Sequence, residues 1–306
     1  MAAAFIAGDW GTSRLRLSLC DAAGFVLESR DGPGIAQARG RVEDAFFEQI
    51  APWEKHGRLP AILSGMVGST IGWREAACLP CPIAPETLAR SLLHFEARGH
   101  GIALAPGLSC RNRLGAPDYM RGEETQILGA LRLEPSLRQG RRILCLPGTH
   151  TKWVSMLDGV IEHCLTAPSG ELYNILHRHS VLVNSNEEID DAQAFAQALE
   201  RISSHPEGGL IHFLFEARSL QLSGELDPRQ AASYLSGLVI AEDVSGASRI
   251  LRIAEAGPVT LIGAPRLAAL YGRALKTNGI ECGTIEGNAA SLQGLTFFRD
   301  AANRTP

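Results

Sequence analysis

Apolar and polar residues alternate strictly in a stretch near the start of the chain. In RLRLSLCD, residues 14–21, the leucines take one face of a strand and the arginines take the other. The apolar run AFIAGDW precedes it across a glycine-containing turn, and FVLESR follows a turn at Gly24. The pattern predicts three antiparallel strands joined by tight turns.

Helical and strand patterns then alternate. We expect helices at residues 42–53 and 87–97, and buried strands at residues 60–69 and 101–108, both containing glycines. This alternation is typical of an α/β protein rather than an all-α or all-β one.

The second half of the chain repeats the opening pattern without sharing its sequence. Strands are predicted at residues 141–146, 152–157 and 160–165, with a Pro-Gly-Thr turn after the first and an Asp-Gly hairpin turn after the second. The remaining predicted elements are a strand at 258–263 and helices at 190–202, 229–244, 264–279 and 289–300.

Composition narrows the class of protein. A chain of 306 residues exceeds the usual size of one hydrophobic core, so two lobes are expected. The net charge of -4 argues against nucleic acid as a partner.

No apolar run is long enough to span a membrane, and the N-terminus lacks the basic residues of a secretory signal. Seven scattered cysteines fit a cytoplasmic location, and ordinary thiols are favoured over a zinc or redox site for the CLPC stretch, Cys78 to Cys81.

The stretch GDWGTSRLR forms the tip of the first predicted hairpin. Backbone N–H groups and hydroxyls of Gly11, Thr12 and Ser13 suit a phosphate oxygen, Asp9 could hold Mg²⁺, and Arg16 could add a contact to the same anion. A plain hairpin with a turn-forming Asp and Gly and solvated arginines explains the same residues.

The stretch LPGTHTKW forms a second tip of the same kind. It is not a P-loop, because no second glycine precedes Lys152. The residues Gly148, Thr149 and His150 occupy the turn, and two such tips could grip one polyphosphate. We expect Lys152 to support the loop or to reach a phosphate as a point charge.

Two further stretches carry candidate chemistry. In MRGEETQILGA, Glu123 and Glu124 open a helix, where a carboxylate serves either the helix dipole or the activation of a hydroxyl. At Gly263-Ala264, small residues between a strand and a helix could accept a flat base, or could simply allow close packing.

The order of these motifs resembles the 2-dehydro-3-deoxygalactonokinase family of the sugar-kinase, actin and heat-shock ATPase superfamily. The resemblance runs nearly end to end, through DWGTSRLRL, GMVGSTIGW, MRGEETQILGA, LPGTHTKWV, SGEL, LSGLVIAEDV and LQGL. It implies two ribonuclease H-like lobes with an interlobe nucleotide cleft. It also implies Mg²⁺-assisted, ATP-dependent phosphorylation of the 6-hydroxyl of 2-dehydro-3-deoxy-D-galactonate, a small-molecule sugar acid.

The resemblance also implies roles for individual residues. Glu123 would be the catalytic carboxylate, with Glu124 as second choice, and Asp9 the metal ligand. The first lobe would comprise residues 1–112 completed by a C-terminal helix at 289–306, and the second lobe residues 113–288. Asp9, Gly11, Thr12 and Ser13 would form a first phosphate loop with Arg16 beside it, and Gly148, Thr149 and His150 a second. ATP would contact these loops, Lys152 and the adenosine turn Gly263-Ala264. The sugar acid would contact Gly65, Met66, Gly68, Ser69, Trp73, Ser169 and Glu171.

The chain departs from the family pattern at several positions. Arg14 replaces a common Asn, Ala77 and Cys78 replace Pro and Tyr, and residues 166–171 read TAPSGE. Because these departures fall mainly on the sugar side, a kinase for another sugar acid, such as 2-dehydro-3-deoxy-D-gluconate, is an alternative. A non-kinase ATPase or ATP sensor of the same fold is a second alternative. The sequence leaves open whether the protein forms a homo-oligomer.

Overall fold

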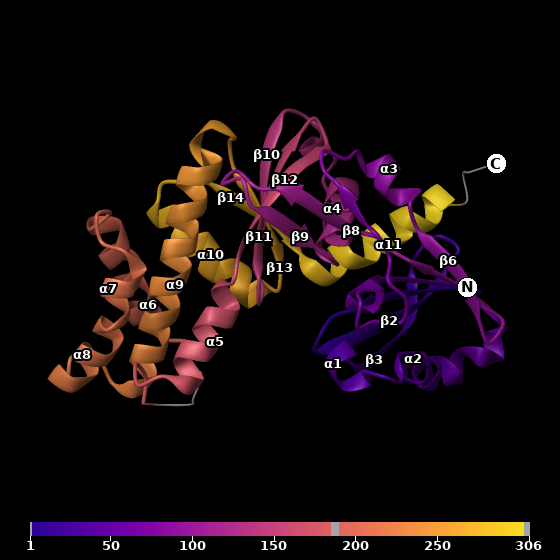
Figure 1. The fold of residues 1–306 in the computed structure, drawn as a ribbon, viewed down its shortest axis with the longest axis horizontal. Coiled ribbons are helices and arrows are strands. Elements are labelled where there is room, and N and C mark those ends of the chain that lie inside the picture. Colours follow the sequence, from indigo (N-terminus) through magenta and orange to yellow (C-terminus); the bar gives the residue numbers. More distant parts are fainter. Residues whose placement is uncertain (1, 185–189, 303–306) are drawn as a thin grey trace. The chain divides into compact units, whose positions relative to one another are not determined.

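The computed structural model describes residues 2–184 and 190–302, so residue 1 and residues 303–306 at the ends of the predicted first lobe lie outside it. Contacts divide the chain into two compact units (Figure 1). Unit 1 comprises Met1–Gly140, Met156–Cys164 and Ile285–Pro306, and unit 2 comprises Arg141–Ser155 and Leu165–Thr284. No helix among the described residues is both long and apolar enough to cross a membrane.

Unit 1 is built on a six-stranded sheet of order β3-β2-β1-β4-β7-β6. The predicted opening strands are present and antiparallel, and β1 then pairs in parallel with β4. The strands are β1 (Ala3–Trp10), β2 (Arg14–Asp21), β3 (Val26–Pro33), β4 (Ala61–Gly65), β6 (Leu93–Ala97) and β7 (His100–Leu104).

Unit 1 also contains a second sheet, of three strands, and several helices. The sheet runs in the order β5 (Cys78–Pro80), β8 (Gly107–Arg111) and β9 (Pro117–Met120). The helices are α1 (Ile35–Ala38), α2 (Val42–Ile50), α3 (Pro85–Ala89), α4 (Glu123–Leu133) and α11 (Gly287–Ala302). The aromatic residues Trp10, Phe46 and Trp53 are buried in its core.

The predicted helix at residues 87–97 is wrong. The helix α3 stops at Ala89, and residues 93–97 form β6, an antiparallel partner of β7. Arg98 and Gly99 join the two strands, with φ values of 48° and 79°. Two successive positive φ angles make a tight hairpin turn, so pairing with β7 overrides the local helical pattern.

A five-stranded sheet of order β12-β11-β10-β13-β14 is the framework of unit 2, although β11, β12 and β14 each continue across the contact-based division. Its strands are β10 (Arg141–Leu146), β11 (Thr151–Leu157), β12 (Val160–Ala167), β13 (Val259–Gly263) and β14 (Cys282–Glu286), and β10 pairs in parallel with β13. In both sheets a trio of consecutive strands is extended by a parallel partner of its first strand. The predicted α/β fold with two ribonuclease H-like lobes is confirmed.

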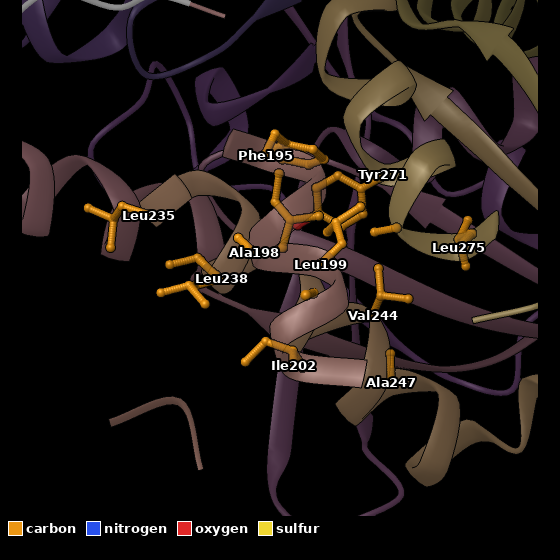
Figure 2. Close-up of a cluster of buried hydrophobic side chains, with 14 of the residues drawn as sticks. Phe195, Ala198, Leu199, Ile202, Leu235, Leu238, Val244, Ala247, Tyr271 and Leu275 are labelled. Atoms are coloured by element: carbon orange, nitrogen blue, oxygen red, sulfur yellow. The ribbon is translucent and has the colours of Figure 1, made fainter. Parts of the chain in front are cut away.

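The helices of unit 2 bury a large apolar cluster. They are α5 (Ser169–His179), α6 (Ala192–Ser204), α7 (Leu210–Leu214), α8 (Glu216–Ser223), α9 (Pro228–Leu251) and α10 (Pro265–Thr277). Figure 2 shows Phe195 and Leu199 of α6 meeting Leu238 of α9 and Tyr271 of α10. The long helix α9 begins with a capping box in which the Asp227 carboxylate accepts the backbone N–H of Gln230.

The contact-based division and the predicted lobes differ at three stretches, residues 113–140, 156–164 and 285–288, which belong to unit 1. Residues 113–140 are held there because β9 pairs with β8 and α4 packs along α11. The lobe boundaries after residue 112 and before residue 289 stay a prediction.

The packing of α4 on α11 depends on two glycines. A Cβ on Gly129 would lie 1.8 Å from the carbonyl oxygen of Ala290, and a Cβ on Gly294 would lie 1.9 Å from that of Thr125. No side chain fits at either position without separating the helices. The two helix backbones therefore touch, and α11 also contacts β1.

We expect Gly294→Ala to lower the free energy of unfolding by about 1–3 kcal/mol or more, because the added methyl group forces α4 and α11 apart. Denaturant titration measures the loss. The matched control is Gly246→Ala in α9, where a Cβ would meet nothing within 4 Å. That change should be neutral or stabilise the helix by up to about 1 kcal/mol. Equal destabilisation by the two substitutions would contradict the packing explanation.

Candidate active site

The first phosphate loop, residues 11–13, lies at the carboxyl end of β1. The carbonyl oxygens of Gly11 and Thr12 accept hydrogen bonds from the backbone N–H groups of Ile35 and Ala36, at 3.1 and 3.0 Å. A Cβ on Gly34 would lie 2.3 Å from the Thr12 carbonyl oxygen, so only glycine allows this approach. The loop is thus fixed from behind by α1, while the side chains of Thr12 and Ser13 stay exposed.

Asp9 lies on β1, two residues before this loop, and belongs to a separate cluster of polar side chains. Arg16 faces it across the strand pair at 3.7 Å, and Ser291 of α11 donates a hydrogen bond to it at 3.2 Å. Gln126 of α4 in turn donates to Ser291 at 3.3 Å. Burial raises the pKa of Asp9, while Arg16 and Ser291 act in the opposite direction.

Arg14 does not join this group. Its guanidinium makes two hydrogen bonds, of 3.0 and 2.6 Å, to the carboxylate of Asp31 on the neighbouring strand. The departure from the family's Asn is therefore accommodated by an exposed ion pair across β2 and β3.

The glycine loop Gly65–Trp73 follows β4 at the same edge of the sheet. Trp10 and Gly65 are register partners, and a Cβ on Gly65, whose φ is 90°, would lie 2.7 Å from the Trp10 carbonyl oxygen. Ser69 donates its hydroxyl to the carbonyl of Met66 at 2.7 Å. Because parallel strands present their carboxyl ends together, the first phosphate loop and the glycine loop adjoin.

Trp73, a predicted sugar contact, packs into an aromatic cluster. Its ring centroid lies 5.4 Å from that of Phe46 and 5.3 Å from that of Phe95, and its indole N–H donates to Glu43 at 3.3 Å. These contacts give Trp73 a packing role beneath the glycine loop.

Gly122 brings the start of α4 to this loop. Its φ is 107°, and a Cβ there would lie 3.3 Å from the Cα of Gly65. Glu123, which opens the helix, accepts the backbone N–H of Arg121 at 3.0 Å and is partly exposed.

Glu124 occupies a different environment from its neighbour. Its side chain is fully buried and accepts hydrogen bonds from the Gly122 N–H at 2.7 Å and the Thr125 hydroxyl at 3.0 Å. Burial, and then the charge of Glu123, raise the pKa of Glu124 to about 8. Glu124 therefore lies away from solvent and bonds to the helix start, whereas Glu123 faces outward.

The second phosphate loop, residues 148–150, follows β10 in unit 2. It packs on the start of α5: the Glu171 N–H donates to the Thr149 carbonyl at 2.9 Å, and a Cβ on Gly170 would lie 2.4 Å from the Gly148 carbonyl oxygen. His150 and Glu171 form a half-exposed pair with Nε2 and Oε2 2.7 Å apart.

A buried network of hydroxyls supports this loop. The Tyr271 hydroxyl donates to Asp243 at 2.6 Å and lies within 2.9 Å of the hydroxyls of Thr151 and Ser169. Trp153 donates its indole N–H to the same carboxylate at 2.8 Å. Burial raises the pKa of Asp243, and these donors counteract it.

Lys152, next to the loop, is buried. Its ammonium donates to the hydroxyl of Thr166 at 2.8 Å. This contact corresponds to the first of its two predicted roles, the support of the loop.

The predicted adenosine turn opens onto a pocket. The turn Gly263-Ala264 ends β13, and a Cβ on Gly263 would lie 3.5 Å from Pro147, beside the second phosphate loop. A pocket of about 340 Å³ extends from Ala264. A smaller one of about 50 Å³ shares three walls with it and reaches Gly148. The shared walls are Tyr173, Ser236 and Leu267.

The predicted residues thus gather in two groups. Unit 1 holds Asp9, the first phosphate loop, the glycine loop and Glu123, and unit 2 holds the second phosphate loop, Ser169, Glu171 and the adenosine turn. Sequence reasoning missed Tyr173 and the Asp243–Tyr271 pair, because α5 was not predicted and a buried network has no signal in the local pattern. Among residues 2–184 and 190–302, no group of three or more acidic, histidine or cysteine side chains could hold a metal ion alone.

Replacing Glu124 by Gln should flatten the dependence of stability on pH. Between the ordinary pKa of 4.5 and the raised value of about 8, the folded protein holds a proton that the unfolded chain has released. Wild-type stability should therefore fall as pH rises through this window, by up to about 1.4 kcal/mol per pH unit, and this fall should be absent in Glu124→Gln. Denaturant titrations at several pH values measure it. A substitution of the exposed Glu75→Gln should follow the wild type, and a Glu124→Gln curve parallel to the wild type would contradict the assignment.

Known proteins resemble this chain over nearly its full length. A probable 2-dehydro-3-deoxygalactonokinase of Rhizobium meliloti is 33% identical over 298 residues, covering 95% of each chain. The 2-dehydro-3-deoxygalactonokinase of Escherichia coli is 32% identical over 303 residues, covering 98% of this chain and 99% of that one.

The fold is also shared with a solved structure. The crystal structure of a Sinorhizobium meliloti protein, provisionally named as the same kinase, superposes with a TM-score of 0.88 at 31% identity, covering 99% of this chain and 98% of that one. The model of the 2-keto-3-deoxy-galactonokinase family matches residues 9–298, so the chain belongs to this family.

Proposed function

We propose that this protein is an ATP-dependent kinase that transfers a phosphoryl group to the 6-hydroxyl of 2-dehydro-3-deoxy-D-galactonate, in galactonate catabolism. The products are the 6-phosphate and ADP. Family membership over residues 9–298 supports the substrate class. The observation that carries the chemistry is the position of Glu123, at the start of α4 and beside the strand ends that bear the first phosphate and glycine loops.

The base is Glu123 rather than Glu124. A general base must come within hydrogen-bond reach of the hydroxyl that it activates, and Glu124 is fully buried with its carboxylate committed to Gly122 and Thr125. Glu123 orients the substrate hydroxyl and accepts its proton as the oxygen attacks the γ-phosphorus. The bond from that phosphorus to the bridging oxygen breaks, and ADP leaves with the electron pair.

Each of the two glycine-containing loops, one in each unit, offers groups that bind phosphate oxygens. Backbone N–H groups and hydroxyls at residues 11–13 and 148–150 offer fixed donors, and Arg16 adds a positive charge. Because α1 and α5 hold these loops from behind, the donors need little reorganisation during transfer. The adenosine moiety occupies the pocket of about 340 Å³ at Ala264, a size typical of cofactor sites.

Asp9 is the residue that fits Mg²⁺. A single carboxylate with neighbouring hydroxyls suits an ion that keeps several of its waters and takes its remaining ligands from phosphate. The bound ion would supply positive charge against the developing charge of the phosphoryl group. Asp9 itself is oriented by Ser291, and through it by Gln126 of the base helix.

We assign Ser169 and Glu171 to the support of the second phosphate loop rather than to contacts with the sugar acid. The hydroxyl of Ser169 is bonded to Thr151 and Tyr271, and Glu171 is paired with His150, so both stabilise the second phosphate loop. A cytoplasmic location accords with the use of ATP and with seven free thiols.

A coupled ADP-release assay with Mg²⁺ and ATP tests the function. We expect turnover with 2-dehydro-3-deoxy-D-galactonate and a lower kcat/KM with its gluconate epimer. Preference for the epimer would move the assignment to another sugar-acid kinase. Release of ADP without any sugar acid would instead indicate an ATPase and would overturn the proposal.

Glu123→Gln should lower kcat by about 10²- to 10⁴-fold, because it removes the proton acceptor but keeps the shape of the side chain. Calorimetry should find ADP binding within a factor of two of the wild type. In the matched variant Glu124→Gln, most of the activity should survive. The reverse ranking of the two variants would assign the base to Glu124.

A further inference from the structure

Arg121, the residue before Gly122, is wedged between two glycines of unit 1. A Cβ on Gly68 would lie 2.9 Å from its Nη1 atom, and a Cβ on Gly107 would lie 3.2 Å from its Cζ atom. Its Nη2 atom donates to the carbonyl of Ala76 at 2.7 Å and contacts the sulfur of Cys78 at 3.1 Å. The glycines thus leave a slot shaped for a guanidinium group.

In the described part of the protein this guanidinium forms no ion pair with a carboxylate. Its hydrogen-bond partners are a neutral carbonyl and a thiol, and its Nη1 atom is buried without any acceptor. Some other arginines of unit 1 are paired with carboxylates, as Arg14 is with Asp31 and Arg132 with Asp300. A buried donor without an acceptor is costly, and each such group in a native protein calls for an explanation, such as a catalytic role or a bound ion or water.

The position of Arg121 suggests which anion completes it. The slot is formed by Gly68 and Ala76 of the segment that contains the glycine loop, and the Arg121 backbone N–H bonds to the carboxylate of Glu123. A substrate that places its hydroxyl at Glu123 has its remaining atoms beside this loop. Guanidinium binds carboxylate more strongly and with more directional preference than other side chains do.

We propose that Arg121 binds the carboxylate of the sugar acid and so selects acids over neutral sugars, an inference that rests on the proposed function. The residue is partly exposed as a whole, so the carboxylate can approach the guanidinium, whose Nη1 protons lack an acceptor. The contacts from Ala76 and Cys78 hold the guanidinium in its plane. The departures from the family pattern at Ala77 and Cys78 therefore lie where the chain supports Arg121. They can act through Arg121 without contacting the sugar acid themselves.

The test compares the sugar acid with a neutral analogue that carries a hydroxymethyl group in place of the carboxylate. In Arg121→Gln, KM for the sugar acid should rise by about 10- to 100-fold, the loss of a charge-assisted hydrogen bond. The KM for ATP, and kcat/KM for the neutral analogue, should stay within a factor of two. Arg74→Gln, which removes an exposed charge packed on Phe95, should change none of these values.

Three results would overturn the inference, and they separate its failure from that of the proposed function. If Arg121→Gln lowers kcat/KM equally for acid and neutral analogue, Arg121 only supports the glycine loop. If the variant keeps the wild-type discrimination, the carboxylate binds elsewhere. If the wild type itself turns over neither compound, the proposed function fails and this inference with it.

A measurement on the wild type covers the case in which Arg121→Gln does not fold. Phenylglyoxal modifies accessible arginines, and peptide mass spectrometry locates the adducts. The sugar acid should protect Arg121 at least several-fold better than the neutral analogue at equal saturation. Equal protection by the two compounds would contradict a contact between Arg121 and the carboxylate.

Discussion

The backbone contact between α4 and α11 is the constraint on which the geometry of unit 1 depends. Two glycines, Gly129 and Gly294, let the helices touch, with no room for a methyl group on either side. Because the helices are this close, Ser291 of α11 reaches both Asp9 of β1 and Gln126 of α4. Hydrogen bonds from Gln126 to Ser291 and from Ser291 to Asp9 thereby connect the proposed metal ligand to the helix that begins at Glu123. The distance between the proposed base and the first phosphate loop is therefore set by helix packing rather than by the loops.

The second phosphate loop, in unit 2, is stabilised by other contacts than the first loop in unit 1, although both follow the first strand of a similar strand trio. In unit 1, Gly34 and the start of α1 take up the loop carbonyls, whereas in unit 2 a buried cluster of hydroxyls around Tyr271 and Asp243 fixes Thr151 at the end of the loop. A buried carboxylate is costly unless its oxygens are bonded, and here an indole and a phenol satisfy it. Such a network stiffens the loop without a lysine at the phosphate, which accords with the burial of Lys152 against Thr166.

Much of the framework could be predicted from local patterns, and the failures have physical reasons. The strands of residues 3–33 were predictable because alternation and turn glycines agree with the final pairing. Residues 93–97 were mistaken for helix because their pairing with β7 through Arg98 and Gly99 is decided by a tertiary contact. At the site, glycine-containing loops were visible as motifs. Arg121 was not, because its significance lies in a missing partner, and only coordinates reveal an absence of that kind.

The adjacent carboxylates Glu123 and Glu124 show why residue type alone could not assign the base. One residue along the helix separates a partly exposed carboxylate from one without contact to solvent, and burial raises the pKa of the second to about 8. Near neutral pH the buried carboxyl is largely protonated, so it would add little repulsion to anionic substrates bound at the proposed site. Its hydrogen bond to the Gly122 N–H instead holds the turn that presents Glu123 to the glycine loop. The two acids therefore differ in role: the buried one shapes the helix start, and the partly exposed one is the proposed base.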